Sequence, residues 1–335
     1  MTPRHRNLAF FVPHAGCPHR CSFCDQNSIS GAAAGPSPEE VAERCDALLP
    51  GPGEGRQVEI AFFGGSFTAV DAAYRQALLA AAAPFVEAGR AFGIRVSTRP
   101  DAIDPAILAE LRRWGVSAIE LGAQSMNDTV LRLNGRGHTA LQTKFAAQLV
   151  KNSGFSLGLQ MMVGLFGEYD PARAARDTAI ALANLGPDTV RIYPTLVLRG
   201  TPLAELTRRG SYRPLGVEQA VEATAPLIEL FERKKIRVIR VGLQDDGALR
   251  ANLVAGPYHP AFRQMCEARL YRQAAQAALR GLPAGRYLLA VAPGGHSAAA
   301  GQRRENLRYF SGQGYDLTVR EDPALSGRQV GLRPL

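Results

Sequence analysis

The chain has 335 residues, of which 46% are hydrophobic, and its 39 basic and 30 acidic residues give a formal charge of +9. This composition excludes a mainly disordered or collagen-like chain, and five cysteines are too few for a disulfide scaffold. No apolar stretch approaches the roughly 20 residues of a membrane helix, so we expect a cytoplasmic protein with reduced thiols and no membrane partner.

Short apolar runs alternate along the chain with segments of helical spacing. The runs of strand length cover residues 8–12, 58–63, 95–98, 118–122, 156–163, 190–193 and 237–241. The helical segments between them cover residues 38–49, 72–83, 105–114, 139–152, 171–185 and 217–234. This alternation predicts a parallel sheet with helices outside. Six or seven such units indicate a complete or partial (β/α)6-type barrel, whose chemistry lies at the C-terminal ends of the strands.

The alternation stops at about residue 250. A helical segment over residues 260–279 is followed by two shorter strand-like runs, over residues 287–292 and 315–319, with glycine-rich joints. This pattern predicts a small α+β appendage. We therefore divide the chain into a barrel over residues 1–245 and an appendage over residues 246–335.

Three cysteines within eight residues are the strongest chemical signal in the sequence. Cys17, Cys21 and Cys24 directly follow the first predicted strand. Three thiolates can hold a four-iron cluster and leave one iron open, whereas structural zinc usually takes four closed ligands. The spacing therefore favours an iron–sulfur cluster. His19 lies inside the loop, and we favour a loop-shaping or substrate-facing role for it over that of a fourth ligand.

The cysteine spacing, with Phe23 before the last cysteine, resembles the signature of the radical S-adenosylmethionine (SAM) superfamily. The resemblance implies a [4Fe–4S] cluster whose open iron chelates the amino and carboxylate groups of SAM. It implies that reduction of this cluster cleaves SAM to a 5′-deoxyadenosyl radical, while the protein supplies orientation and protection. It also implies that the backbone at Phe23 contacts adenine. An external donor such as a flavodoxin or ferredoxin would supply the electron.

Glycines and polar residues follow the second, third and fourth predicted strands, where this superfamily binds SAM. Paired glycines at a strand end let a ligand approach the backbone closely, although a simple tight turn is the alternative. A charged residue inside an apolar strand needs a partner, so Glu120 is either a site residue or part of an ion pair, for instance with Arg191. The candidates for the SAM wall are Gly64, Gly65, Ser66, Thr98, Arg99, Glu120 and Gln124.

Longer segments narrow the resemblance. FFGGSFT, STRPD, ELGAQS, RGHT and VRIYPTLVLRGTPLAEL resemble the radical SAM domain of the Elongator catalytic subunit, over residues 8–241. The cluster and glycine motifs are shared more loosely with oxygen-independent coproporphyrinogen oxidases. Arg191, Tyr193 and Arg199 lie in the most specific stretch and are candidate substrate-facing residues. Two features depart from the Elongator subunit: the gap between the first two cysteines is shorter, and no clear acetyl-CoA phosphate loop follows residue 241.

The resemblance implies the modification of a transfer RNA base, so we favour RNA as the substrate and expect no DNA partner. The charge of +9 agrees with a phosphate-rich partner. However, 35 of the 39 basic residues are arginines, and a GC-rich genome would also favour arginine over lysine codons. A small-molecule or porphyrin-like substrate, a non-catalytic module that binds a cluster or SAM, and a structural zinc protein are the alternatives.

Overall fold

The computed structural model describes residues 6–12, 17, 20–25, 34–55, 58–243 and 247–335. His19 lies outside the described residues, as does the predicted domain boundary at residue 245. Seven strands form one parallel sheet and pair in chain order. They are β1 (Arg6–Val12), β2 (Val58–Gly64), β3 (Gly93–Thr98), β4 (Val116–Gln124), β5 (Ser156–Val163), β6 (Thr189–Pro194) and β8 (Arg237–Val241). Since β1 and β8 are the two edges of this curled sheet, the predicted α/β class and partial barrel are confirmed.

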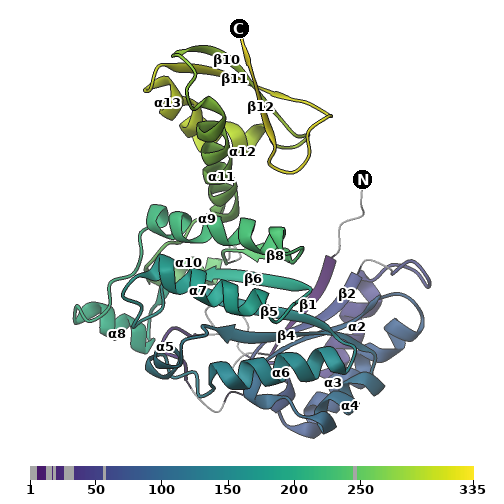
Figure 1. The fold of residues 1–335 in the computed structure, drawn as a ribbon. Coiled ribbons are helices and arrows are strands. Elements are labelled where there is room, and N and C mark those ends of the chain that lie inside the picture. Colours follow the sequence, from purple (N-terminus) through teal and green to yellow (C-terminus); the bar gives the residue numbers. More distant parts are fainter. Residues whose placement is uncertain (1–5, 13–16, 18–19, 26–33, 56–57, 244–246) are drawn as a thin grey trace.

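Helices cover the outer face of the sheet (Figure 1). They are α2 (Pro38–Leu48), α3 (Ala72–Glu87), α4 (Pro105–Arg113), α6 (Ala140–Asn152), α7 (Pro171–Ala183) and α9 (Val217–Arg233). Ser37 begins α2 with a capping box, and the Asp104 side chain caps α4, so side-chain acceptors satisfy the first free N–H groups of both helices. The prediction for α3 was too short, because the helix continues through Pro84 to Glu87.

Side chains alternate across each strand between the helical layer and the barrel interior. On β4, Ile119 and Leu121 belong to the hydrophobic core under the helices. Glu120 and Gly122 face the interior, where they line a cavity. The register pairs Glu120 with Ser97 of β3 and with Gly158 of β5. The fold therefore brings polar residues from neighbouring strands into one interior space.

Several short elements lie between the predicted ones. They are α5 (Asp128–Leu133), β7 (Val197–Leu198), α8 (Pro202–Arg208), α10 (Gly247–Asn252), β9 (Leu253–Ala255) and three 3-10 helices (Phe67–Ala69, Pro100–Ala102, Gln302–Arg304). The strands β7 and β9 pair in antiparallel fashion. These elements are too short to show a periodic apolar pattern, and this explains why the sequence did not predict them.

The C-terminal part is a smaller α+β unit, as predicted. It consists of α11 (Phe262–Leu279), β10 (Gly285–Val291), α12 (His296–Ala300), α13 (Glu305–Ser311), β11 (Tyr315–Glu321) and β12 (Val330–Pro334). Its sheet has the order β11-β10-β12. Figure 1 shows α11 as the stem between the barrel and this unit. Phe262 and Cys266 belong to the barrel core, whereas Tyr271 and Leu279 belong to a second core under the small sheet.

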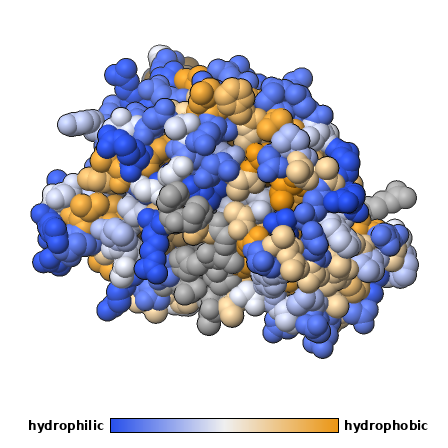
Figure 2. All heavy atoms as spheres, turned by 90° about the horizontal axis from the view of Figure 1, so that it is seen from below, coloured by the Kyte–Doolittle hydropathy of each residue, from blue (hydrophilic) through white to orange (hydrophobic). Residues whose placement is uncertain are grey.

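The surface of the barrel mixes charged and apolar side chains. Figure 2 shows hydrophilic and apolar residues interspersed over the face seen from below. Leu141 and Phe145, one turn apart on α6, are among the exposed apolar side chains. Within the described ranges, no helix combines the length and the apolar character needed to cross a membrane.

Candidate active site

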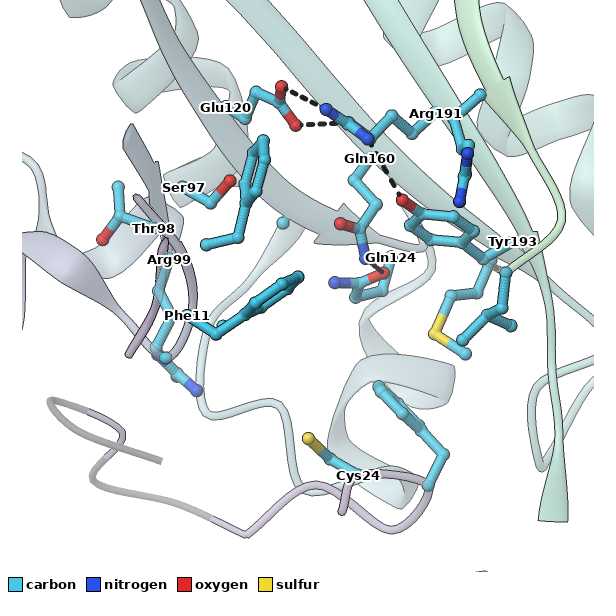
Figure 3. A pocket seen from close by; sticks show the side chains of 18 of the residues that line it. Phe11, Cys24, Ser97, Thr98, Arg99, Glu120, Gln124, Gln160, Arg191 and Tyr193 are labelled. Atoms are coloured by element: carbon cyan, nitrogen blue, oxygen red, sulfur yellow. Dashed lines mark hydrogen bonds and ion pairs between the residues drawn. The ribbon is translucent and has the colours of Figure 1, made fainter. Parts of the chain in front are cut away.

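A cavity of about 720 Å³ lies in the barrel interior and is lined by residues of all seven parallel strands. This volume is within the usual range for small-molecule and cofactor sites. In Figure 3, Cys24 lies at one end of the cavity and the ion pair of Glu120 with Arg191 at the other. The sequence-predicted residues that line it are Cys17, Phe23, Cys24, Gly64, Gly65, Thr98, Arg99, Glu120, Gln124, Arg191 and Tyr193.

Three predicted residues do not line the cavity. Cys21 and Ser66 are buried behind its wall. Arg199 is exposed between β7 and α8, where its backbone N–H donates to the carbonyl of Asn252. Arg199 therefore lies apart from the other candidates.

The cysteine loop is held by the segment that follows α5. The backbone N–H of Ser22 donates to the carbonyl of Asn134 at 3.0 Å, and its hydroxyl donates to Asn134 Oδ1 at 2.7 Å. The N–H of Leu203 in α8 donates to the carbonyl of Ser22 at 2.8 Å. Gly135 has a φ of +63°, and a Cβ there would lie 3.0 Å from the carbonyl oxygen of Arg20. Only a glycine lets the two segments approach this closely without strain.

Two guanidinium groups surround the thiols. Arg136 donates from Nη1 to the Cys21 sulfur at 3.2 Å and from Nη2 to the carbonyl of Gly122 at 2.7 Å. Burial raises the pKa of the Cys17 thiol, and the neighbouring Cys21 raises it further, while Arg99 and Arg136 oppose this shift. Cys17 and Cys21 therefore lie near each other, and the two guanidinium groups offset only part of the rise in the pKa of Cys17.

The donor set fits an iron–sulfur cluster in its chemistry. Thiolates are the ligands that such clusters require, and Cys17, Cys21 and Cys24 lie at the same end of the barrel. Among the residues that the structure describes, however, no three His, Cys, Asp or Glu side chains lie close enough together to hold a metal ion. The assignment of the cysteines as cluster ligands therefore stays a prediction.

Hydrogen bonds fix the ends of β2 and β3 beside the thiols. The Ser66 hydroxyl is 3.0 Å from Thr98 Oγ1 and accepts a hydrogen bond from the N–H of Arg99 at 3.2 Å. The side chain of Ser66 is therefore engaged within the wall. Gly64 has a φ of +107°, and a Cβ there would lie 3.0 Å from the carbonyl oxygen of Val12. Gly64 and Gly65 line the cavity, and the N–H of Gly65 donates to the carbonyl of Val12 at 2.7 Å.

Arg99 carries a buried donor that has no partner among the described residues. Its Nε and Nη2 donate to the Asp101 carboxylate at 2.9 and 3.0 Å, and Nη2 also donates to the carbonyl of Arg136. Its Nη1 is buried and has no hydrogen-bond partner among the described residues. Because buried donors are normally satisfied, this nitrogen is a candidate contact for an anionic group of a ligand.

A chain of buried charges crosses the barrel interior. Arg95 on β3 contacts Glu59 on β2 at 2.7 Å and Glu120 on β4 at 3.2 Å. Glu120 also contacts Arg191 on β6 at 2.7 Å, and the Arg191 guanidinium lies 4.9 Å from the centre of the Phe63 ring. The ion pair with Arg191, one of the two interpretations of Glu120 from sequence, is therefore present. Glu120 also lines the cavity.

Several polar residues of the interior were not predicted from the sequence. Arg95 and Gln160 both line the cavity, and Gln160 donates to Gln124 Oε1 at 3.2 Å. Both residues interrupt apolar strands, as Glu120 does. The same argument about buried polar groups in strands could have found them. Arg136 carried no comparable signal, because it precedes a helix in a polar segment.

Glu168, just after β5, is expected to make stability depend on pH. Its carboxylate accepts from the N–H groups of Gly164 and Leu165 at 3.0 and 3.2 Å, yet burial raises its pKa to about 8. The unfolded chain ionises near 4.5, so the stability contributed by Glu168 is lost as pH rises from about 4.5 to 8. We expect Glu168→Gln to raise the free energy of unfolding at pH 8 and to flatten this pH dependence. Urea denaturation at pH 5 and pH 8 measures both effects, and a variant that loses stability as the parent does would contradict the prediction.

Comparisons with known proteins agree with the geometry. A family model described as "Radical SAM superfamily" matches residues 11–178, and one described as "Radical_SAM C-terminal domain" matches residues 187–272. The chain is 33% identical over 134 residues to a tRNA uridine(34) acetyltransferase of Methanocaldococcus jannaschii. The matched stretch covers 40% of this chain and 25% of the relative. The chain is also 34% identical over 152 residues to the human Elongator complex protein 3, covering 42% and 26% of the two chains.

A solved structure shows the same fold. The structure of an archaeal Elp3 from Methanocaldococcus infernus superposes with a TM-score of 0.64 and 23% identity, covering 83% of this chain and 65% of that one. The chain spans about a quarter of the length of the curated relatives above.

Proposed function

The chain belongs to the radical SAM superfamily of enzymes, and we propose that it binds a [4Fe–4S] cluster and SAM to abstract a hydrogen atom from a base of transfer RNA. Cys17, Cys21 and Cys24 would hold the cluster. When bound, the cluster and SAM supply a 5′-deoxyadenosyl radical. The observation that carries the proposal is the position of the cysteine loop, which is fastened by Asn134 at the end of a cavity large enough for a cofactor.

The chain's own residues orient SAM in this proposal. Gly64 and Gly65 line the cavity and would lie against SAM, while the Ser66 and Thr98 side chains hydrogen-bond to each other. Nη1 of Arg99, which has no partner in the described part of the chain, would donate to a carboxylate of the ligand. Phe23 also lines the cavity and offers an apolar surface next to the cysteines. These groups lie on the side of the cavity that holds the thiols.

The far side of the cavity would receive the substrate. Gln160 presents its amide group there, with Arg191 and Tyr193 beside it, and it donates a hydrogen bond to Gln124, a predicted residue of the SAM wall (Figure 3). Amide, guanidinium and phenol groups can hydrogen-bond to the edges of an unstacked base. One relative of the chain is named a tRNA uridine(34) acetyltransferase, and this similarity supports RNA over a small molecule. An external reductant such as a flavodoxin or ferredoxin would supply electrons. We place the protein in the cytoplasm, together with this reductant and the transfer RNA.

Two measurements, made one after the other, test the proposal. Anaerobic reconstitution with iron and sulfide should give a protein that cleaves SAM to 5′-deoxyadenosine under a strong reductant. Mass spectrometry of tRNA nucleosides from a deletion strain should then show a missing or altered nucleoside that the intact gene restores. Absence of SAM cleavage after full cluster loading contradicts the enzyme proposal. An unchanged nucleoside profile contradicts the RNA substrate alone.

A further inference from the structure

The positive charge of the chain is concentrated in its last quarter. Residues 247–335 contain 12 arginines, no lysine and 5 acidic residues, a net charge of +7. Residues 1–246 contain 27 basic and 25 acidic residues, a net charge of only +2. Codon bias acts on the whole chain and does not explain a difference between its two parts. The asymmetry therefore indicates that the C-terminal unit meets a negatively charged partner.

Part of this charge joins the C-terminal unit to the barrel. Arg269 of α11 pairs with Glu218 and Glu222 of α9. Arg328 pairs with Glu232 of α9 at 2.5 Å and with Glu267 at 2.6 Å. These contacts account for two of the twelve arginines. They also attach the unit to α9 of the barrel.

Other arginines lie on the face of the small sheet opposite its helices. Helices α11, α12 and α13 contact the sheet, and Tyr287 and Leu317 are buried in the core between them. The register pairs Leu288 with Arg333, and Ala290 with Arg320. These pairs alternate with the buried residues, so their side chains lie on the opposite face.

Three exposed arginines, Arg286, Arg320 and Arg333, define what we call the arginine face. Asp316 also lies on this face and pairs with Arg286 at 3.6 Å, where both side chains are more than 70% exposed. Thr318 occupies the next position of β11 and contributes a hydroxyl. The described strands of this face thus carry three cationic groups and one acidic group.

We propose that the arginine face binds the phosphate backbone of the RNA substrate. Guanidinium groups match phosphate oxygens with two parallel hydrogen bonds, and the Thr318 hydroxyl adds a further donor. The inference rests on RNA being the substrate, as proposed above. It assigns to the C-terminal unit the task of holding the RNA body, while the barrel acts on one base.

A cleft places this unit next to the catalytic cavity. The cleft is lined by Arg263 of α11, by Gly294 just before α12, by Ser297 of α12, and by residues of β8. Ile239 and Arg240 border both this cleft and the barrel cavity. RNA held by the C-terminal unit is therefore bound by a part of the molecule that adjoins the cavity wall at β8.

The test compares two triple variants of the full-length, reconstituted protein. One variant changes Arg286, Arg320 and Arg333 to glutamine. The control changes three exposed arginines of α7 and α9, Arg173→Gln, Arg176→Gln and Arg233→Gln, so that both lose the same charge. Binding to bulk host tRNA is measured by filter binding between 50 and 300 mM KCl. At about 150 mM salt we expect the first variant to bind about 100-fold more weakly, with a salt slope reduced by about 2 to 3. The control should change by less than about threefold.

The outcomes separate this inference from the proposed function. SAM cleavage without RNA should be the same in both variants and in the parent. If the parent binds tRNA and the two triple variants have the same tRNA affinity as each other, the inference is wrong and the RNA substrate stands. If the parent shows no salt-dependent binding of tRNA, both are wrong. If the first variant keeps its tRNA affinity but is reduced more slowly by a flavodoxin, the face binds an acidic protein and the inference is overturned.

A second variant guards against loss of folding in the triple one. Thr318→Glu keeps all three arginines and places a negative charge among them. We expect it to weaken tRNA binding and to leave the thermal unfolding midpoint close to that of the parent. Unchanged tRNA affinity in a folded Thr318→Glu protein would count against the arginine face.

Discussion

Replacing Cys24 with alanine is expected to reduce 5′-deoxyadenosine formation to the background of the assay. Cys24 lines the cavity, and its backbone N–H donates to the carbonyl of Cys21 at 3.1 Å, so the two residues share one turn of the loop. With two thiolates left, a four-iron cluster loses one of its three protein ligands. Iron and sulfide content and the visible absorption of the reconstituted protein measure the loss directly, independently of turnover.

The chain provides two matched control cysteines. Cys45 of α2 and Cys266 of α11 are fully buried, and burial raises the pKa of each thiol to about 12. Such thiols act as small apolar side chains and not as thiolate ligands. We expect Cys45→Ala and Cys266→Ala to keep their iron and their SAM cleavage, at a cost of about 1 kcal/mol in stability. Loss of iron in either control, or retention of the full cluster in Cys24→Ala, would contradict the assignment.

All seven parallel strands of the barrel followed from the sequence, because each is a short apolar run bounded by a helix of regular spacing. The predicted helix starts at residues 38 and 105 agree with the structure, where the side chains of Ser37 and Asp104 cap the two helices. The antiparallel pair β7 and β9 did not follow, since the two strands are very short and lie more than 50 residues apart. Tertiary pairing, and not local pattern, stabilises such elements.

The residues of the candidate site also fall into those that local motifs predicted and those that tertiary pairing brings together. The cysteine loop and the glycines after β2 are contiguous motifs, so their positions could be read from the sequence. Arg191 was named from the sequence as an example of a partner for Glu120, and the structure contains this pair, but the second partner, Arg95, 25 positions away, was not predicted. Alternation shows which face of a strand a residue occupies, but the register decides which residues meet. The β4–β5 register also shifts between Gly122 and Gln124, which no spacing rule indicates.

From the sequence, Glu120 is either a residue that contacts the ligand or a member of a structural ion pair. A substitution at Glu120 distinguishes these two roles. Glu120 is 4% exposed and lies between Arg95 and Arg191. Glu120→Gln keeps the shape but removes the charge that pairs with the buried Arg95 and the half-buried Arg191. Removing one partner of a buried ion pair costs about 3–5 kcal/mol, and we expect a loss of free energy of unfolding of this size in urea at pH 7.

The matched control is Glu229→Gln, which breaks the exposed pair of Glu229 with Arg233 at 3.9 Å. Exposed pairs contribute about 0–1 kcal/mol, so this variant should unfold almost as the parent does. If Glu120→Gln also stays within about 1 kcal/mol of the parent but binds SAM more weakly, the carboxylate serves the ligand and the ion chain adds little to stability. If Glu120→Gln loses stability while the folded fraction binds SAM normally, the charge chain is a structural brace of the barrel. Because stability and SAM binding are measured separately, the experiment distinguishes the two roles.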